Sequence, residues 1–120
     1  MMTISFIPND KGNPPGKLAD AELHFTMPGT GELGGAYTRP DEVLAGLKLI
    51  GFGIWERRTA TRDGMRTGRY VTFPARQYSI NGERRSFALL RPHTDTDAQD
   101  RLRDWILAEY DRFLAAAEAA

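Results

Sequence analysis

The sequence predicts an α+β domain, built as a small antiparallel β-sheet with an Asn-Gly hairpin followed by one C-terminal amphipathic helix. Three observations predict this fold. Apolar and polar residues alternate in several short runs before Pro92, which is the β-strand period. Asn81-Gly82 separates two of these runs, and this dipeptide is a strong hairpin signal. Large apolar residues then recur at helical spacing, at Leu102, Trp105, Ile106, Tyr110, Phe113 and Leu114.

Length and composition are those of one small globular domain. The chain has 120 residues, of which 41% are hydrophobic and 27% charged. It has no cysteine, which excludes disulfides and thiolate metal sites. We find no signal peptide and no apolar run long enough to cross a membrane, so we expect a cytoplasmic protein. The expected organisation is a flexible N-terminal arm over residues 1–16, a single domain over 17–114 and a fraying tail over 115–120.

The first expected strand covers Lys17 to Phe25, where apolar and polar residues alternate as in a half-buried strand. Before it, the run Asn13-Pro14-Pro15-Gly16 favours extended chain without amide donors, which is typical of a loose arm. Ile4 and Phe6 also alternate with polar residues, so a short added strand is possible there.

The next segment is rich in glycine. A turn is expected over residues 28–31, a second strand over 32–38 and a helical turn over 41–44, opened by Pro40. Residues 29–34 match the pattern G-x-G-x-x-G, but the residues after it do not predict the helix that a dinucleotide-binding fingerprint requires. We therefore interpret this pattern as a glycine-rich turn.

Residues 47–56 are apolar on both faces, which predicts a central strand buried on two sides. Gly51 and Gly53 within it indicate a bend or a close approach of another segment. The polar stretch over residues 57–69 predicts either a mobile loop or a long hairpin connection.

Residues 70–80 and 83–90 form the predicted Asn-Gly hairpin. A two-residue turn sets the register, so Ile80 faces Glu83, and the residues expected on the core face are Phe73, Ala75, Ala88 and Leu90. Pro74 cannot donate to the ladder and is expected at an edge or bulge. The opposite face carries Arg76, Tyr78, Arg85 and Phe87.

The helix is expected to begin with a capping box of Thr96 and Gln99, or with Asp97 as the cap one residue later. Trp105 and Ile106 lie in the middle of its apolar stripe. We expect both to be buried.

Charge is unevenly distributed although the net charge is zero. Residues 56–92 carry nine arginines and three acids, whereas residues 93–120 carry three arginines and seven acids. Arginine suits phosphate, and arginines interleaved with exposed aromatics suit nucleic acid, but a solvated sheet face explains the arginines equally well. The face with Tyr78 is alternatively covered by the N-terminal strands or by a second subunit.

The sequence contains no recognisable catalytic or metal-binding pattern. His24 and His93 lack a second ligand at helical spacing, and the acids Asp95, Asp97, Asp100 and Asp104 are explained by helix capping and pairing. No serine has a nucleophile-elbow context. We therefore expect no enzyme, no cofactor and no metal.

Several short motifs resemble the SpoVG (septation/sporulation regulator) family. They are 17–23 (KLADAEL), 70–76 (YVTFPAR), 81–85 (NGERR), 89–92 (LLRP) and 101–110 (RLRDWILAEY), and the likeness covers residues 17–113. The sequence departs from the family pattern at Gln77, where the family is basic, in the acids before the helix and in a longer insertion around residues 31–44.

The resemblance implies a homodimeric α+β domain with a regulatory role, which binds DNA and RNA with little sequence preference. It also places Arg76 and Arg101 at positions that are basic in the family pattern. Acids at the helix start repel phosphate, so the hairpin and residues 57–69 are the better surface. The expected nucleic-acid-binding residues are Arg57, Arg58, Arg62, Arg66, Arg76, Tyr78, Arg85 and Arg101. The alternative function is a protein-interaction or structural dimerisation module without nucleic acid.

Overall fold

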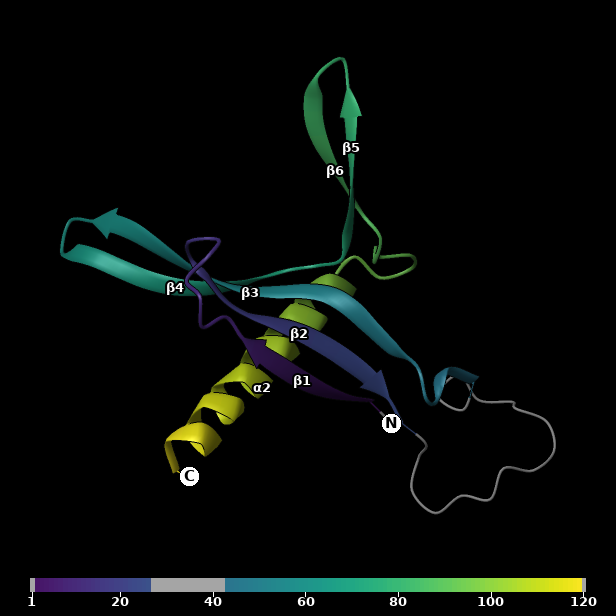
Figure 1. Ribbon diagram of the computed structural model, residues 1–120, viewed down its shortest axis with the longest axis horizontal. Helices are drawn as coiled ribbons and strands as arrows, with labels where there is room; N and C mark the ends of the chain where they lie inside the picture. The colour runs from purple at the N-terminus through teal and green to yellow at the C-terminus, as the bar shows by residue number, and fades with distance from the viewer. Residues whose placement is uncertain (1, 27–42, 120) are drawn as a thin grey trace.

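The computed structural model describes residues 2–26 and 43–119, and for Arg66 the backbone only. It is an α+β fold, as the sequence predicts: an antiparallel sheet of order β1-β2-β3-β4, a separate two-stranded sheet and a C-terminal helix (Figure 1). The elements are β1 (Met2–Pro8), β2 (Lys17–Phe25), β3 (Lys48–Thr61), β4 (Gly64–Thr72), β5 (Ala75–Ile80), β6 (Glu83–Ala88) and α2 (Ala98–Ala119). Val43 and Leu44 are also helical.

The N-terminal residues are part of the sheet and not a loose arm. Met2–Pro8 pairs antiparallel with β2, placing Phe6 opposite Ala21. The alternation of Ile4 and Phe6 explains this pairing, because both side chains pack against the core while their neighbours face outwards. The short additional strand that the sequence analysis named as an alternative is therefore present.

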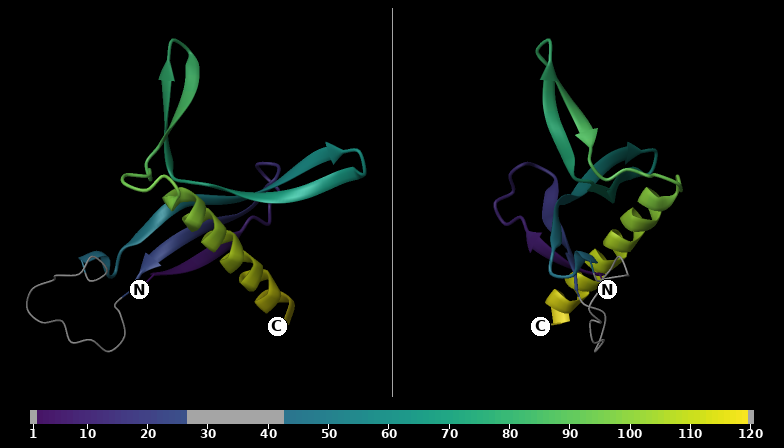
Figure 2. Two further views of the ribbon diagram at one scale, coloured as in Figure 1. Left: turned by 180° about the vertical axis from the view of Figure 1, so that it is seen from behind. Right: turned by 90° about the vertical axis from the view of Figure 1, so that its right-hand side faces the viewer.

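The core lies between one face of the four-stranded sheet and α2, which crosses that face diagonally (Figure 2). Its fully buried side chains are Ala19, Ala21, Leu23, Phe52, Ile54, Val71, Ile106 and Tyr110. The period of two in β2 and the helical period in α2 direct these residues to the same layer. Ile106 is buried as predicted, whereas Trp105 is only half-buried at the edge of the core.

β3 is an interior strand, as predicted, but it is buried on both faces only at residues 52–54. Ile50 remains 58% exposed because α2 covers a single face of the sheet. A close approach occurs at Gly53, where an added Cβ would lie 2.7 Å from Trp55 Nε1 and 2.9 Å from Thr72 Oγ1. The indole of Trp55 therefore covers the outer face of β3 at this glycine.

Residues 57–69 form a hairpin, which was one of the two predicted alternatives. β3 and β4 remain paired as far as Thr61 opposite Gly64, around a turn at Arg62 and Asp63. Apart from Arg69, which pairs with Asp111 of α2, this part projects from the body (Figure 1). We call residues 57–69 the long hairpin.

The Asn-Gly hairpin has the predicted register, with Ile80 opposite Glu83 and Ala75 opposite Ala88. Asn81 has the positive φ that this turn requires, at 51°. The predicted burial of its core face is wrong for Ala75, which is exposed like every residue of β5. Phe73 and Leu90, just outside the ladder, do pack against the core.

Ala75 is exposed because the chain changes direction at Pro74. Its ring is buried against Gly51, 3.1 Å from the position of an added Cβ, and it breaks the strand between β4 and β5. The chain therefore leaves the sheet, and β5 and β6 project as a second arm (Figure 1). We call residues 75–88 the short hairpin.

The helix begins at Ala98, so Asp97 is the flanking residue, as in the second of the two predicted starts. The expected capping box is not formed: the Gln99 side chain instead donates a hydrogen bond of 3.0 Å to the carbonyl of Leu90. This bond links the start of the helix to the segment just after the short hairpin. The helix continues to Ala119, past the boundary expected at residue 114.

The predicted turn at 28–31, the strand at 32–38 and the glycine pattern at 29–34 lie outside the described residues, as does the first half of the helical turn at 41–44. Over the whole molecule the extents are 59 × 49 × 29 Å and the radius of gyration is 17.7 Å. A compact chain of this length has a radius of gyration of about 14 Å. The two projecting hairpins contribute to this extended shape.

Candidate nucleic-acid interface

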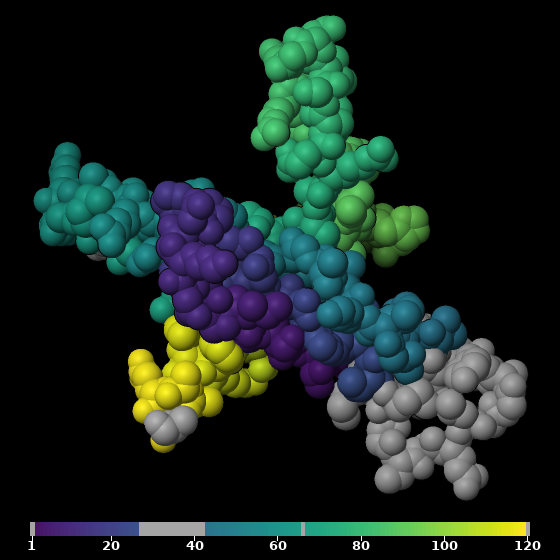
Figure 3. Space-filling model, in the orientation of Figure 1, coloured from purple at the N-terminus to yellow at the C-terminus, as the bar shows by residue number. Residues whose placement is uncertain are grey.

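The arginines expected to form one positive surface lie on two separate hairpins. Arg57, Arg58, Arg62 and Arg66 belong to the long hairpin, and Arg76 and Arg85 to the short one. The two hairpins form distinct lobes that point in different directions (Figure 3). Any polyanion that contacts all of these residues must therefore bridge two lobes.

The long hairpin is basic on both faces. It carries five arginines and one aspartate, and it contains no aromatic residue. Arg57 and Arg58 are opposite Gly68 and Thr67, so consecutive arginines point to opposite faces. The Arg57 guanidinium lies 4.9 Å from the centroid of the Tyr70 ring at the root of the hairpin. Arg58 and Arg62 are exposed and have no ion pair within the described part of the chain.

The short hairpin has two chemically different faces. Its aromatic face carries Arg76, Tyr78, Ile80, Glu83, Arg85 and Phe87. The other face carries small or polar residues and Arg84. Arg85 is opposite Tyr78 and Arg76 is opposite Phe87, so cations and rings alternate as predicted. Tyr78 is 39%, Ile80 48% and Phe87 45% exposed, so no N-terminal strand covers this face.

Two of the arginines near this face have partners. Arg85 lies 3.2 Å from Glu83, in a pair whose side chains are 56% and 71% exposed. Exposed pairs of this kind contribute little and exchange easily with another anion. The Arg91 guanidinium lies 4.6 Å from the centroid of the Phe87 ring and so covers one side of it. Arg76 and Arg84 have no ion pair or ring contact among the described residues.

Arg101, expected as a binding residue, lies away from both hairpins at the start of α2. Its Nη1 donates a hydrogen bond of 2.6 Å to Asp95 Oδ2. This bond, together with the bond from the Asp97 backbone N–H, holds the pKa of Asp95 below its usual 3.8. Arg101 is thus paired within an acidic segment, which makes it a poor phosphate ligand.

A row of cations and aromatics that we did not predict crosses the outer face of the sheet. Trp55 and Tyr70 are cross-strand neighbours whose rings are stacked with centroids 6.4 Å apart. Lys17 lies 5.7 Å from the Trp55 ring, and Trp55 Nε1 donates a hydrogen bond of 2.9 Å to Thr72. The alternation with the buried Ile54 and Val71 could have identified this row, because period two puts their neighbours on the opposite face.

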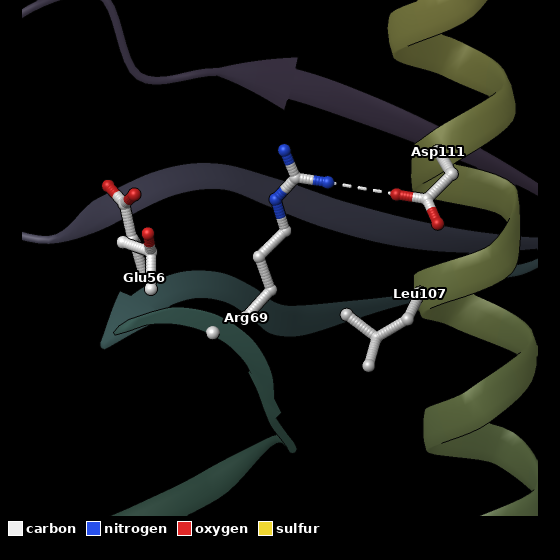
Figure 4. A pocket seen from close by; sticks show the side chains of 6 residues that line it. Glu56, Arg69, Leu107 and Asp111 are labelled. Carbon is white, nitrogen blue, oxygen red and sulfur yellow. Dashed lines mark hydrogen bonds and ion pairs between the residues drawn. The ribbon is translucent and has the colours of Figure 1, made fainter. Parts of the chain in front are cut away.

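A polar hollow of about 470 Å³ lies where the long hairpin meets α2 (Figure 4). Arg69 crosses it to reach Asp111, with Nη1 2.9 Å from Oδ1, and its guanidinium lies 5.3 Å from the Tyr110 ring. Leu107 forms an apolar part of the wall. Arg69 therefore joins the sheet to the helix, unlike Arg58 and Arg62, which have no ion pair among the described residues.

Polar residues on the outer face of β1 and β2 do not assemble a catalytic arrangement. Ser5 Oγ lies 3.0 Å from His24 Nε2, the distance of a nucleophile from a base. However, Glu22 approaches the same nitrogen at 3.5 Å, so it does not orient the ring from its other side. Among residues 2–26 and 43–119 no group of three His, Asp or Glu side chains is placed to hold a metal ion.

No described helix is both long and apolar enough to span a membrane. Comparison with known proteins gave no match: no family model, curated protein or solved structure is significantly similar to the chain. Its function is therefore inferred from the chemistry of its surface.

Proposed function

We propose that this chain is a nucleic-acid-binding regulatory protein of the SpoVG-like kind, which binds weakly and with little sequence preference. The observation that carries the proposal is the presence of unpaired arginines on two hairpins that project from the body. Arg58, Arg62, Arg76 and Arg84 are exposed and have no acidic partner in the part of the chain that the structure describes. Guanidinium groups held away from the protein's own acids are available to phosphate.

The charge distribution supports the same surface. Acids are concentrated in α2 and the segment before it, where arginines such as Arg103 and Arg112 pair with Asp100 and Glu109. The hairpins carry the surplus of positive charge. A polyanion would therefore approach the hairpins and be repelled from the helix. Because the long hairpin offers charge and no aromatic ring, binding there would be insensitive to sequence.

The test is a salt titration of binding to labelled single-stranded and duplex DNA and RNA. Each phosphate contact contributes about 0.9 to the slope of log affinity against log salt for duplex DNA. We expect the double variant Arg58→Ala with Arg62→Ala, and the double variant Arg76→Ala with Arg85→Ala, to bind more weakly and to flatten this slope. Arg112→Ala removes one charge from the helix and serves as the control, with the slope unchanged.

Absence of binding at low salt would remove the proposal. Binding that Arg112→Ala weakens as much as the hairpin variants do would move the interface to the helix. Either result is read on folded protein, because all of these arginines are exposed or paired only at the surface.

A second candidate function is homodimerisation through the same elements. The observation that favours it is the exposure of Tyr78, Ile80, Phe87 and Leu89 in and beside the short hairpin, together with the outer edges of β1 and β4, which pair with no further strand among the described residues. Exposed apolar residues and free edges are typical of surfaces that a partner covers. A dimer is expected in sedimentation, and a mass near 13.4 kDa at micromolar concentration would contradict it.

A further inference from the structure

We propose that Tyr78 is a base-stacking residue and that the aromatic face of the short hairpin selects unpaired bases over duplex. This inference depends on the proposed nucleic-acid binding and adds to it the class of nucleic acid. The two hairpins then have different roles in binding. The long hairpin supplies charge alone, whereas the short hairpin presents rings and arginines together.

The ring of Tyr78 is open to a ligand. It is 39% exposed, and within the described residues it has no stacked ring, no cation over its face and no side-chain hydrogen bond. The aromatic residues of the body differ. Trp55 and Tyr70 stack on each other and have Lys17 and Arg57 over their rings. Phe87 is intermediate, since Arg91 covers one side of its ring.

Two arginines lie beside Tyr78 on the same face of the hairpin. Arg85 is directly opposite Tyr78 on the neighbouring strand, and Arg76 precedes Tyr78 by two residues on the same face. A base stacked on Tyr78 would therefore have its own phosphates within reach of two guanidinium groups. Stacking with adjacent charge is how proteins bind single strands without reading their sequence.

The spacing between Tyr78 and Phe87 suits an unpaired strand better than a duplex. Tyr78 and Phe87 are diagonal neighbours across the ladder, because Phe87 lies two residues beyond the partner of Tyr78. Diagonal residues in an antiparallel pair are roughly 7–8 Å apart. A duplex strand advances about 3.4 Å per base and keeps each base face covered by the next base. Only an unstacked strand, stretched to roughly twice that step, places successive bases on both rings.

The experiment compares a single-stranded oligonucleotide with a duplex of the same length, by fluorescence anisotropy at one low salt concentration. Tyr78→Val removes the ring but keeps a residue that favours β-strands. We expect single-strand affinity to fall about 5- to 150-fold, the range for loss of one stacked base, with duplex affinity unchanged. Tyr78→Phe keeps the ring and should bind as the unmodified protein does.

Arg84→Ala is the matched control on the other face of the same hairpin. It tests whether any change to the hairpin weakens binding, and it should affect single strand and duplex equally. As an independent readout, irradiation of a bound single strand containing 5-iodouracil should attach the strand to Tyr78, mapped by mass spectrometry. A cross-link at Trp55 or Tyr70 in its place would overturn the assignment.

The outcomes separate this inference from the proposed function. Binding of single strand and duplex that survives Tyr78→Val unchanged overturns stacking and leaves phosphate binding intact. Equal weakening of both ligands by Tyr78→Val likewise overturns it. A sedimentation mass that falls to that of the monomer in Tyr78→Val assigns the face to a protein interface, which also overturns it. No binding of either ligand by the unmodified protein rejects the proposed function itself.

Discussion

The body of the molecule and its two hairpins use the same residue types in opposite ways. In the body, large apolar side chains from β2, β3 and α2 meet in one layer, and arginines such as Arg103 are paired with acids. In the hairpins, Tyr78, Ile80 and Met65 remain exposed and several arginines have no partner among the described residues. The difference indicates that the body provides stability, while the hairpins are available to a ligand or partner.

The largest expected difference in stability is between substitutions at two isoleucines, one in the body and one on a hairpin. Ile106 is completely buried in α2, whereas Ile80 is 48% exposed on the short hairpin. Ile106→Ala should lower the free energy of unfolding by about 2–5 kcal/mol, because it leaves a cavity in the core. Ile80→Ala should lower it by less than about 1 kcal/mol, mostly through β-propensity.

Denaturant titration of both variants measures this difference. Equal losses would mean that a second subunit or another segment buries Ile80 in solution. That result would favour the dimerisation module over the nucleic-acid interface on this hairpin.

The next largest difference in stability is expected between substitutions at two glycines. A Cβ at Gly53 would lie 2.7 Å from Trp55 Nε1 and 2.9 Å from Thr72 Oγ1, whereas a Cβ at Gly68 would have no atom within 4 Å. Gly53→Ala should destabilise the protein by about 1–3 kcal/mol, since the indole must move. Gly68→Ala on the long hairpin should be neutral, or stabilising by up to about 1 kcal/mol.

Thermal unfolding of the two variants, with near-ultraviolet circular dichroism to report on the indole, tests the prediction. A neutral Gly53→Ala with an unchanged tryptophan signal would show that the row of Lys17, Trp55 and Tyr70 is loosely held. The outer face of the sheet would then be no more tightly packed than the hairpins.

Substitutions of two arginines at different distances from the body should affect different properties, one stability and the other nucleic-acid binding. Arg69 pairs with Asp111 and lies over Tyr110, while Arg62 lies in the turn of the long hairpin without an ion pair in the described structure. Arg69→Ala should destabilise by about 0.2–1 kcal/mol, as expected for an exposed ion pair. Arg62→Ala should leave stability unchanged and weaken nucleic-acid binding.

Chemical denaturation and anisotropy on the same two variants make this comparison. If Arg62→Ala lowered stability and Arg69→Ala lowered binding, the assignment of roles along the hairpin would have to be reversed.

The smallest effect concerns pH and Asp95. Hydrogen bonds from Arg101 and from the Asp97 N–H lower the pKa of this carboxyl below 3.8 in the folded protein. A lowered folded pKa means that the contribution to stability is present above pH 3.8 and is lost as the pH falls through the folded pKa. Asp95→Asn should therefore be slightly less stable than the unmodified protein at neutral pH, and the difference should vanish in acid.

Stability measured against pH for Asp95→Asn and for Arg101→Ala checks this. Asp95→Asn removes the titrating group altogether, whereas Arg101→Ala leaves the hydrogen bond from the Asp97 N–H to Asp95 and should keep part of the pH dependence. A difference that persists at the lowest pH would assign the effect to the helix start in general and not to ionisation of Asp95.

Local patterns in the sequence determined much of the fold. The Asn81-Gly82 turn predicted the hairpin and its register correctly, because a two-residue turn allows one pairing. Helical spacing identified α2 and the burial of Ile106, and the apolar run at residues 47–56 identified an interior strand. These features depend on neighbours in the chain, which the sequence displays directly.

Tertiary structure alone decided which faces are covered. The sequence placed Ala75 in the core because alternation identifies two faces of a strand but not what lies against each. The bend at Pro74 turns the short hairpin away from α2, and a single helix can cover only one face of the sheet. For the same reason the arginines could be counted from the sequence, but their division between two diverging hairpins and the pairing of Arg69 with Asp111 depend on how segments far apart in the chain are arranged.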